Sequence, residues 1–275
     1  VIGHSIGEFA AAVIAGCMSL ETAVELVACR GRLMGAVSED GAMAAVFAEK
    51  SVAEKLLEGT ENCVIAVFNS KTNTVVSGAR EQVELVLQRA AESGIKSKRL
   101  VVSNAFHSPL MKQAAESFAL VAGRGQYDEP KLPFISTVYA REFAPGEKPD
   151  AKYWCAQIMK PVNFYESVLS VKNPQDYFFL EIGATNTLSM LTDMILENGA
   201  QCAASLTRGK DDRAQLGETA ARLYKSGFAL KWESYLGVED TGWSRSAGLP
   251  NYPFERTRYW KELCYDSKVN AELLD

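Results

Sequence analysis

Gly3-His4-Ser5-Ile6-Gly7 lies near the start of the chain and fits the pattern G-x-S-x-G. In this pattern a serine occupies a sharp turn between a strand and a helix, which exposes its hydroxyl at the helix N-terminus. We expect small glycines to allow the tight turn, and the Ile6 amide and the helix dipole to stabilise an oxyanion. The alternative is a turn between glycines in which Ser5 only caps the helix.

The elements on either side of this turn predict an α/β fold. Residues 1–2 are expected to end a strand, and helices are expected over residues 9–15 and 19–37. Beyond residue 104, predicted strands, one of them over residues 134–139, alternate with predicted helices. This alternation indicates an α/β core with a parallel sheet.

Residues 43–103 interrupt that core. Their pattern changes to strand, helix, strand, strand, helix, strand, which predicts an inserted ferredoxin-like α+β subdomain. Its first helix is expected to begin with a capping box from Ser51 to Glu54 and to stop at Gly59.

The sequence therefore divides into three predicted parts. Residues 1–42 and 104–210 form the core, residues 43–103 the subdomain, and residues 211–275 a C-terminal helix and a linker that is extended from Trp243. Because the first residue is a valine and not a methionine, we expect the chain to be a fragment whose core lacks its N-terminal part.

Composition excludes several classes of function. The chain has 275 residues with 29 basic and 34 acidic side chains, and this net charge of −5 argues against nucleic acid as a partner. The longest nearly uncharged stretch, residues 9–20, is too short to span a membrane. Six scattered cysteines without a CxxC pair are typical of a cytoplasmic protein, and two histidines far from any cysteine cluster predict no metal site.

A serine nucleophile needs a base, and His107 is the one histidine remote from Ser5 in sequence. It could equally be a structural histidine that follows a strand. His4 is adjacent to Ser5, so its side chain should diverge on the tight turn, and we interpret it as structural support.

Arg30 is predicted to point inward. At helical spacing it is surrounded by apolar residues, whereas Arg32 shares its side with acidic residues and is expected to be solvated. A buried guanidinium must be paired, and its planar fork suits a carboxylate. That carboxylate could belong to a ligand held beside Ser5 or to a structural Asp or Glu.

Together these segments resemble the malonyl-CoA:acyl carrier protein transacylase family, and more closely the acyltransferase domain of a polyketide synthase. The resemblance extends from Val1 to about Trp260. It rests on motifs that occur in the family's order: Gly3 to Glu8, Arg30, Ala105-Phe106-His107-Ser108, Tyr153-Trp154, Gln157, Pro161 to Phe164, Phe179 to Gly183, Ser205 to Gly209, and the tail from Leu249 to Trp260.

The resemblance implies that the α/β core is hydrolase-like, and it implies a role for each site residue. Ser5 would be the acylated nucleophile and His107 the base, with a backbone carbonyl near Gln157 orienting the imidazole. Arg30 would hold the free carboxylate of malonyl-CoA. No cofactor is expected; the acyl group would pass to the phosphopantetheine thiol of an acyl carrier protein, and ketosynthase and linker domains would be neighbours.

Extender selectivity is predicted from the segment before the base. Malonyl-selective relatives resemble His-Ala-Phe-His and methylmalonyl-selective ones Tyr-Ala-Ser-His, while this chain has Asn104-Ala105-Phe106-His107. The ring of Phe106 leaves less room for an α-methyl group, and Ile6 agrees with the malonyl type. Discrimination by one methyl group amounts to about 1–3 kcal/mol, so a methylmalonyl-selective enzyme stays an alternative.

Some features depart from the family's pattern. Asn104 replaces a usual histidine, Gln157 a common asparagine, and Ala184 a frequent proline. The N-terminal Gly-Gln-Gly motif, which supplies the family's second oxyanion donor, is absent from these residues. We therefore expect these 275 residues alone to transfer malonyl poorly.

Two other classes of function compete with this interpretation. A patatin-like serine hydrolase also uses G-x-S-x-G, and Asp40-Gly41-Ala42 imitates its aspartate segment, although we interpret that segment as a turn. A non-catalytic docking module would retain the fold without using the site.

Overall fold

The computed structural model describes residues 1–237 and 252–255, and these fall into two compact units, Val1–Phe228 and Ala229–Asp275. In the second unit, the short helix α10 (Trp232–Leu236) ends at Gly237, whose φ of 64° is left-handed. Most of the predicted extended tail from Trp243 lies outside the described residues. In the described part of the chain, no helix is both long and apolar enough to cross a bilayer.

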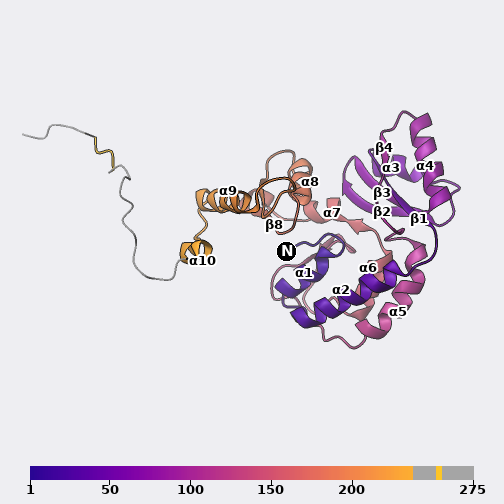
Figure 1. The fold of residues 1–275 in the computed structure, drawn as a ribbon, viewed down its shortest axis with the longest axis horizontal. Helices are drawn as coiled ribbons and strands as arrows, with labels where there is room; N and C mark the ends of the chain where they lie inside the picture. Colours follow the sequence, from indigo (N-terminus) through magenta and orange to yellow (C-terminus); the bar gives the residue numbers. More distant parts are fainter. Residues whose placement is uncertain (238–251, 256–275) are drawn as a thin grey trace, which may run out of the picture. The chain divides into compact units, whose positions relative to one another are not determined.

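A group of helices forms the core around the start of the chain: α1 (Gly7–Ile14), α2 (Leu20–Gly35), α5 (Lys112–Ala122) and α6 (Ala151–Met159) (Figure 1). They bury one apolar cluster, in which the rings of Phe9 and Trp154 stack with their centroids 4.2 Å apart. Aromatic side chains of this size contribute much of the burial energy of a core. The cluster joins the first helix to α6, more than 130 residues later in the chain.

The inserted segment forms the predicted ferredoxin-like arrangement, with α3 and α4 on one side of its sheet (Figure 1). Its strands pair in the order β4-β1-β3-β2 and are antiparallel. A fifth strand from the core, β7 (Val162–Asn163), adds to β2 in parallel. The subdomain is therefore hydrogen-bonded to the core. Its elements are β1 (Gly41–Val46), α3 (Lys50–Leu56), β2 (Cys63–Ser70), β3 (Asn73–Ala79), α4 (Arg80–Glu92) and β4 (Ser97–Arg99).

Parallel pairing occurs in the rest of the chain, as the α/β prediction requires. Strand β8 (Phe178–Glu181) pairs in parallel with β9 (Gln201–Ala204), and Ile2 makes a parallel bridge to Ile135. The other elements are η1 (Pro109–Met111), β5 (Ile135–Ser136), β6 (Arg141–Glu142), α7 (Phe164–Leu169), η2 (Pro174–Asp176), α8 (Thr187–Ile195) and α9 (Asp212–Lys225). The α/β fold class is confirmed.

Two local predictions are wrong. The expected strand over residues 134–139 is reduced to β5, because the Ser136 hydroxyl accepts hydrogen bonds from the amides of Val138 and Tyr139 and turns the chain. The expected capping box at Ser51 does not form, since α3 begins two residues earlier than that box requires and Glu49 is its N-cap, without a side-chain bond. The carbonyl of Glu49 already accepts the first helical amides.

Candidate active site

Ser5 lies on a strained turn between the Ile2 bridge and α1. Its φ of 50° is left-handed, a conformation that non-glycine residues adopt at a cost and that often marks functional sites. A Cβ on Gly3 would come within 2.3 Å of the Glu8 backbone, so the turn requires glycine there. A Cβ on Gly7 would meet nothing within 4 Å, so the expectation of tight packing holds for Gly3 and is wrong for Gly7.

The structure brings His107 to Ser5. The Nε2 atom of His107 lies 2.7 Å from the Ser5 hydroxyl, and its Nδ1 lies 3.0 Å from the backbone carbonyl of Lys160. A carbonyl can only accept, so Nδ1 carries the ring proton and donates it, which leaves Nε2 to accept the serine proton. The pair therefore has the geometry and the tautomer that activate a serine.

The carbonyl that orients His107 belongs to Lys160, three residues beyond the predicted Gln157. Lys160 is the C-cap of α6 and is followed by Pro161, which disfavours helical backbone at the residue before it. Its carbonyl has no partner within the helix and is free to reach the imidazole. The backbone of Gln157 also acts on the imidazole and, like that of Lys160, raises the pKa of His107. The side-chain amide of Gln157 donates to the backbone carbonyl of Ser5 at 2.7 Å.

Burial keeps His107 neutral. Desolvation, followed by the positive charge of Arg30, lowers the pKa of His107 to about 4, although the Lys160 carbonyl opposes this shift. At neutral pH Nε2 of the imidazole is therefore unprotonated and can accept a proton, as a general base must.

Arg30 is buried as its helical spacing predicts, with 7% of its surface exposed, whereas Arg32 is exposed. Its guanidinium donates to the Ser5 hydroxyl at 3.4 Å, and its Nε has no hydrogen-bond partner among the described residues. No Asp or Glu carboxylate of the described residues lies within 4.0 Å of it. Desolvation lowers the pKa of Arg30 to about 10, which leaves it charged, and Glu8 acts in the opposite direction. The part of the chain that the structure describes therefore holds a buried cation beside the nucleophile and no acid that forms a salt bridge with it.

The other predicted residues lie around this centre. Ile6 follows the serine and is 51% exposed. Phe106 is half-buried and packs against both the helical core and the cluster between core and subdomain. Asn104 is buried, and its side-chain amide donates to the backbone carbonyl of Val37, just beyond the end of α2, the helix that carries Arg30.

His4 diverges from Ser5, as expected for the turn. Its Nε2 lies 3.0 Å from the side-chain oxygen of Asn69 in β2, and its ring lies against Phe164. Burial lowers the pKa of His4, so this link between the turn and the subdomain is neutral at physiological pH. Among the described residues, no group of three or more His, Cys, Asp or Glu side chains could hold a metal ion.

Comparison with known proteins shows which family the chain belongs to. A family model described as "acyl transferase domain" matches residues 1–227. The chain belongs to this family. It is 35% identical to polyketide synthase GfsA of Streptomyces halstedii over 266 residues, which are 95% of the chain and 4% of that protein. The domain thus spans a small part of this relative.

Solved structures give the same family. The acyltransferase domain from the second module of the salinomycin polyketide synthase matches with a TM-score of 0.81 and 32% identity, over 92% of this chain and 59% of that one. A malonyl-CoA:acyl carrier protein transacylase from Xanthomonas oryzae pv. oryzae matches with a TM-score of 0.69 and 28% identity, over 79% and 69% respectively. This acyl transferase domain is similar to both.

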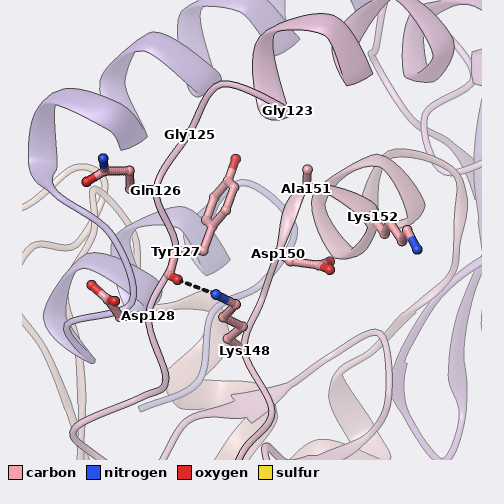
Figure 2. Close-up of a pocket in the computed structure, with 9 residues that line it drawn as sticks. All are labelled: Gly123, Gly125, Gln126, Tyr127, Asp128, Lys148, Asp150, Ala151 and Lys152. Carbon is pink, nitrogen blue, oxygen red and sulfur yellow. Dashed lines mark hydrogen bonds between the residues drawn. The ribbon is translucent and has the colours of Figure 1, made fainter.

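A surface hollow of about 530 Å³ lies apart from these residues, at the beginning of α6 (Figure 2). The Lys148 ammonium donates to the carbonyl of Tyr127 across it, at 3.0 Å. Gln157 and Lys160 are at the opposite end of α6, and the hollow is lined by none of the predicted site residues. The hollow is therefore separate from the cluster of Ser5, His107 and Arg30.

Proposed function

We propose that this acyl transferase domain moves a malonyl unit from malonyl-CoA, through an ester on Ser5, to the phosphopantetheine thiol of an acyl carrier protein. The observation that carries the proposal is Arg30, a buried cation 3.4 Å from the nucleophile with no Asp or Glu carboxylate of the described residues within 4.0 Å. A guanidinium binds a carboxylate through two parallel hydrogen bonds, and malonyl groups carry a free carboxylate.

The reaction follows from the hydrogen bonds of the site. The Ser5 oxygen attacks the thioester carbonyl while its proton passes to Nε2 of His107, 2.7 Å away. The C–S bond then breaks, and the CoA sulfur leaves with the proton that His107 returns. The carrier thiol attacks the Ser5 ester in the reverse sense, its proton again passing through His107 and returning to the serine oxygen. The Ile6 amide, at the N-terminus of α1, would donate to the oxyanion in both steps.

The direct test is intact-mass detection of the acyl-enzyme. The whole protein is expected to gain a malonyl group on Ser5 when mixed with malonyl-CoA, and Ser5→Ala should gain none. A patatin-like hydrolase would cleave simple esters and accumulate no malonyl ester. A docking module would do neither. Failure to detect the adduct on the protein with Ser5 intact would contradict the proposed function.

Selectivity for malonyl over methylmalonyl is proposed to rest on the ring of Phe106. Phe106→Ser should let an α-methyl group enter and shift the ratio of kcat/KM for methylmalonyl-CoA over malonyl-CoA upward by about 10- to 100-fold. Competition between the two thioesters for Ser5, followed by mass spectrometry, measures the ratio. Leu110→Ala, a nearby half-buried side chain outside this segment, is the control and should leave it unchanged. An unchanged ratio in Phe106→Ser would assign selectivity elsewhere.

The wider context is also proposed. Because the relatives are much longer proteins, we infer that ketosynthase and linker domains are neighbours. We also propose that the domain binds no cofactor. The division of the chain at residues 42, 103 and 210 and a cytoplasmic location stay predictions.

A further inference from the structure

Glu8 is a buried acid that the proposed chemistry does not use. It lies in the first turn of α1, three residues after the nucleophile, and none of its surface is exposed. Acids in the first turn of a helix normally face water, where they interact with the helix dipole at little cost. Removing a carboxyl group from water costs free energy, which only hydrogen bonds to that group offset.

Two donors from distant segments converge on one oxygen of Glu8. The backbone amide of Thr137 donates to Oε1 at 2.7 Å, and the hydroxyl of Tyr153 donates to the same atom at 2.9 Å. Since the proton of Tyr153 is directed to Glu8, the Ser136 hydroxyl donates to the Tyr153 oxygen at 2.8 Å. Glu8 therefore ties α1 to α6 and to the turn that follows β5.

Helix α6 contacts both reacting groups. Tyr153 and Gln157 are four residues apart and share one face of the helix. Tyr153 contacts Glu8, and Gln157 contacts the carbonyl of Ser5. One turn later, the carbonyl of Lys160 holds Nδ1 of His107. The position of α6 thus sets both the backbone of the nucleophile and the ring of the base.

We propose that Glu8 is a positioning residue for acyl transfer: its hydrogen bond to Tyr153 fixes α6 on the serine turn, so that Ser5 and His107 stay in register. The inference rests on the proposed function for the identity of the acyl donor. The hydrogen bonds of Glu8 from which it is argued do not depend on that function. Glu8 is not a salt-bridge partner of Arg30, because no carboxylate lies within 4.0 Å of that guanidinium among the described residues. The length of the Glu8 side chain, and not its charge, is the property that matters.

Two substitutions of Glu8 distinguish the length of its side chain from its acidic group. Glu8→Gln keeps the length and the accepting oxygen and removes the acidic group, whereas Glu8→Asp keeps the acidic group and shortens the side chain. We expect Glu8→Gln to stay within about 3-fold of the unmodified protein and Glu8→Asp to lose about 100-fold in the rate of Ser5 acylation, since a misplacement of ~1 Å costs rate at that scale. KM for malonyl-CoA should stay unchanged in both. Glu21→Asp, which shortens an exposed acid in the first turn of α2, is the matched control and should have no effect.

The rate is measured with two reagents on the whole protein. A fluorophosphonate labels an activated serine without needing Arg30 or a malonyl group, and modification of the Ser5 peptide is followed by mass spectrometry. If malonyl-CoA fails to acylate the unmodified protein, the proposed function is contradicted. The rates of fluorophosphonate labelling then still test whether Glu8 positions Ser5 and His107. The inference is overturned if Glu8→Asp reacts like the unmodified protein or if Glu8→Gln loses as much rate as Glu8→Asp.

Should Glu8→Asp fail to fold, Tyr153→Phe makes the same test from the other side. It removes one hydroxyl and keeps the ring that packs on Trp154. We expect about a 10-fold lower labelling rate with unchanged KM for malonyl-CoA, and an unchanged rate overturns the inference.

Discussion

Arg30→Met is expected to raise KM for malonyl-CoA by about 10²- to 10³-fold, because the substrate carboxylate loses a buried, charge-assisted partner worth roughly 3–4 kcal/mol. The methionine fills similar space among the apolar side chains of the core, so the pocket keeps its shape. Acylation by acetyl-CoA, which has no carboxylate, should be unchanged or faster. Steady-state kinetics with the two thioesters measure the difference.

The same substitution should stabilise the protein. Arg30 is desolvated and its Nε has no partner among the described residues, so the folded chain bears the cost of a buried cation. Replacing such a group by an apolar one often stabilises by about 1–2 kcal/mol or more, which corresponds to a rise in Tm of roughly 2–8 °C. A gain in stability combined with a loss of substrate binding distinguishes a ligand-binding cation from a structural one.

Arg32→Met is the matched control, because Arg32 lies on the exposed side of the same helix. It should change neither KM nor Tm by a measurable amount. If Arg30→Met lowered Tm and left KM for malonyl-CoA unchanged, Arg30 would be a structural residue and the proposed substrate would be wrong.

Local patterns predicted the parts of the site that local geometry determines. The G-x-S-x-G turn places Ser5 before α1 because Gly3 must lie against the Glu8 backbone. The 3.6-residue period placed Arg30 on the buried side of α2, since its neighbours on that side are apolar. Both features depend on residues that are close together in the chain, so they can be predicted from the sequence.

Contacts between distant segments were not predictable in this way. The carbonyl that orients His107 has no side-chain signature, and Pro161 after Lys160 was the one local signal that a helix ends there. Glu8 looks like an ordinary acid in the first turn of a helix; its burial depends on Tyr153, 145 residues later. Such contacts are decided by how α6 packs on α1.

His107→Asn is expected to lower the rate of Ser5 labelling by a fluorophosphonate about 10³-fold, because the site loses its general base. Asparagine suits this position, since His107 has a left-handed φ of 55° that asparagine adopts more readily than alanine. The variant should therefore fold, and Tm measured beside the labelling rate serves as the control. A rate close to that of the unmodified protein would mean that another group activates Ser5.

The pH profile of the unmodified protein tests the same base independently. Because desolvation and Arg30 lower the pKa of His107 to about 4, the ring stays neutral from pH 7 down to about 5 and binds a proton only below that. The labelling rate should be flat over that range and fall with a midpoint near pH 4, with a neutral reagent so that only protein groups titrate. In the unfolded chain the His107 ring titrates near its ordinary pKa of about 6.5. Between pH 6.5 and pH 4 the unfolded state therefore binds more protons than the folded state, and the free energy of unfolding decreases as the pH falls. A labelling midpoint near 6.5 would mean that the imidazole is solvated in the working enzyme, which would contradict the buried position of His107.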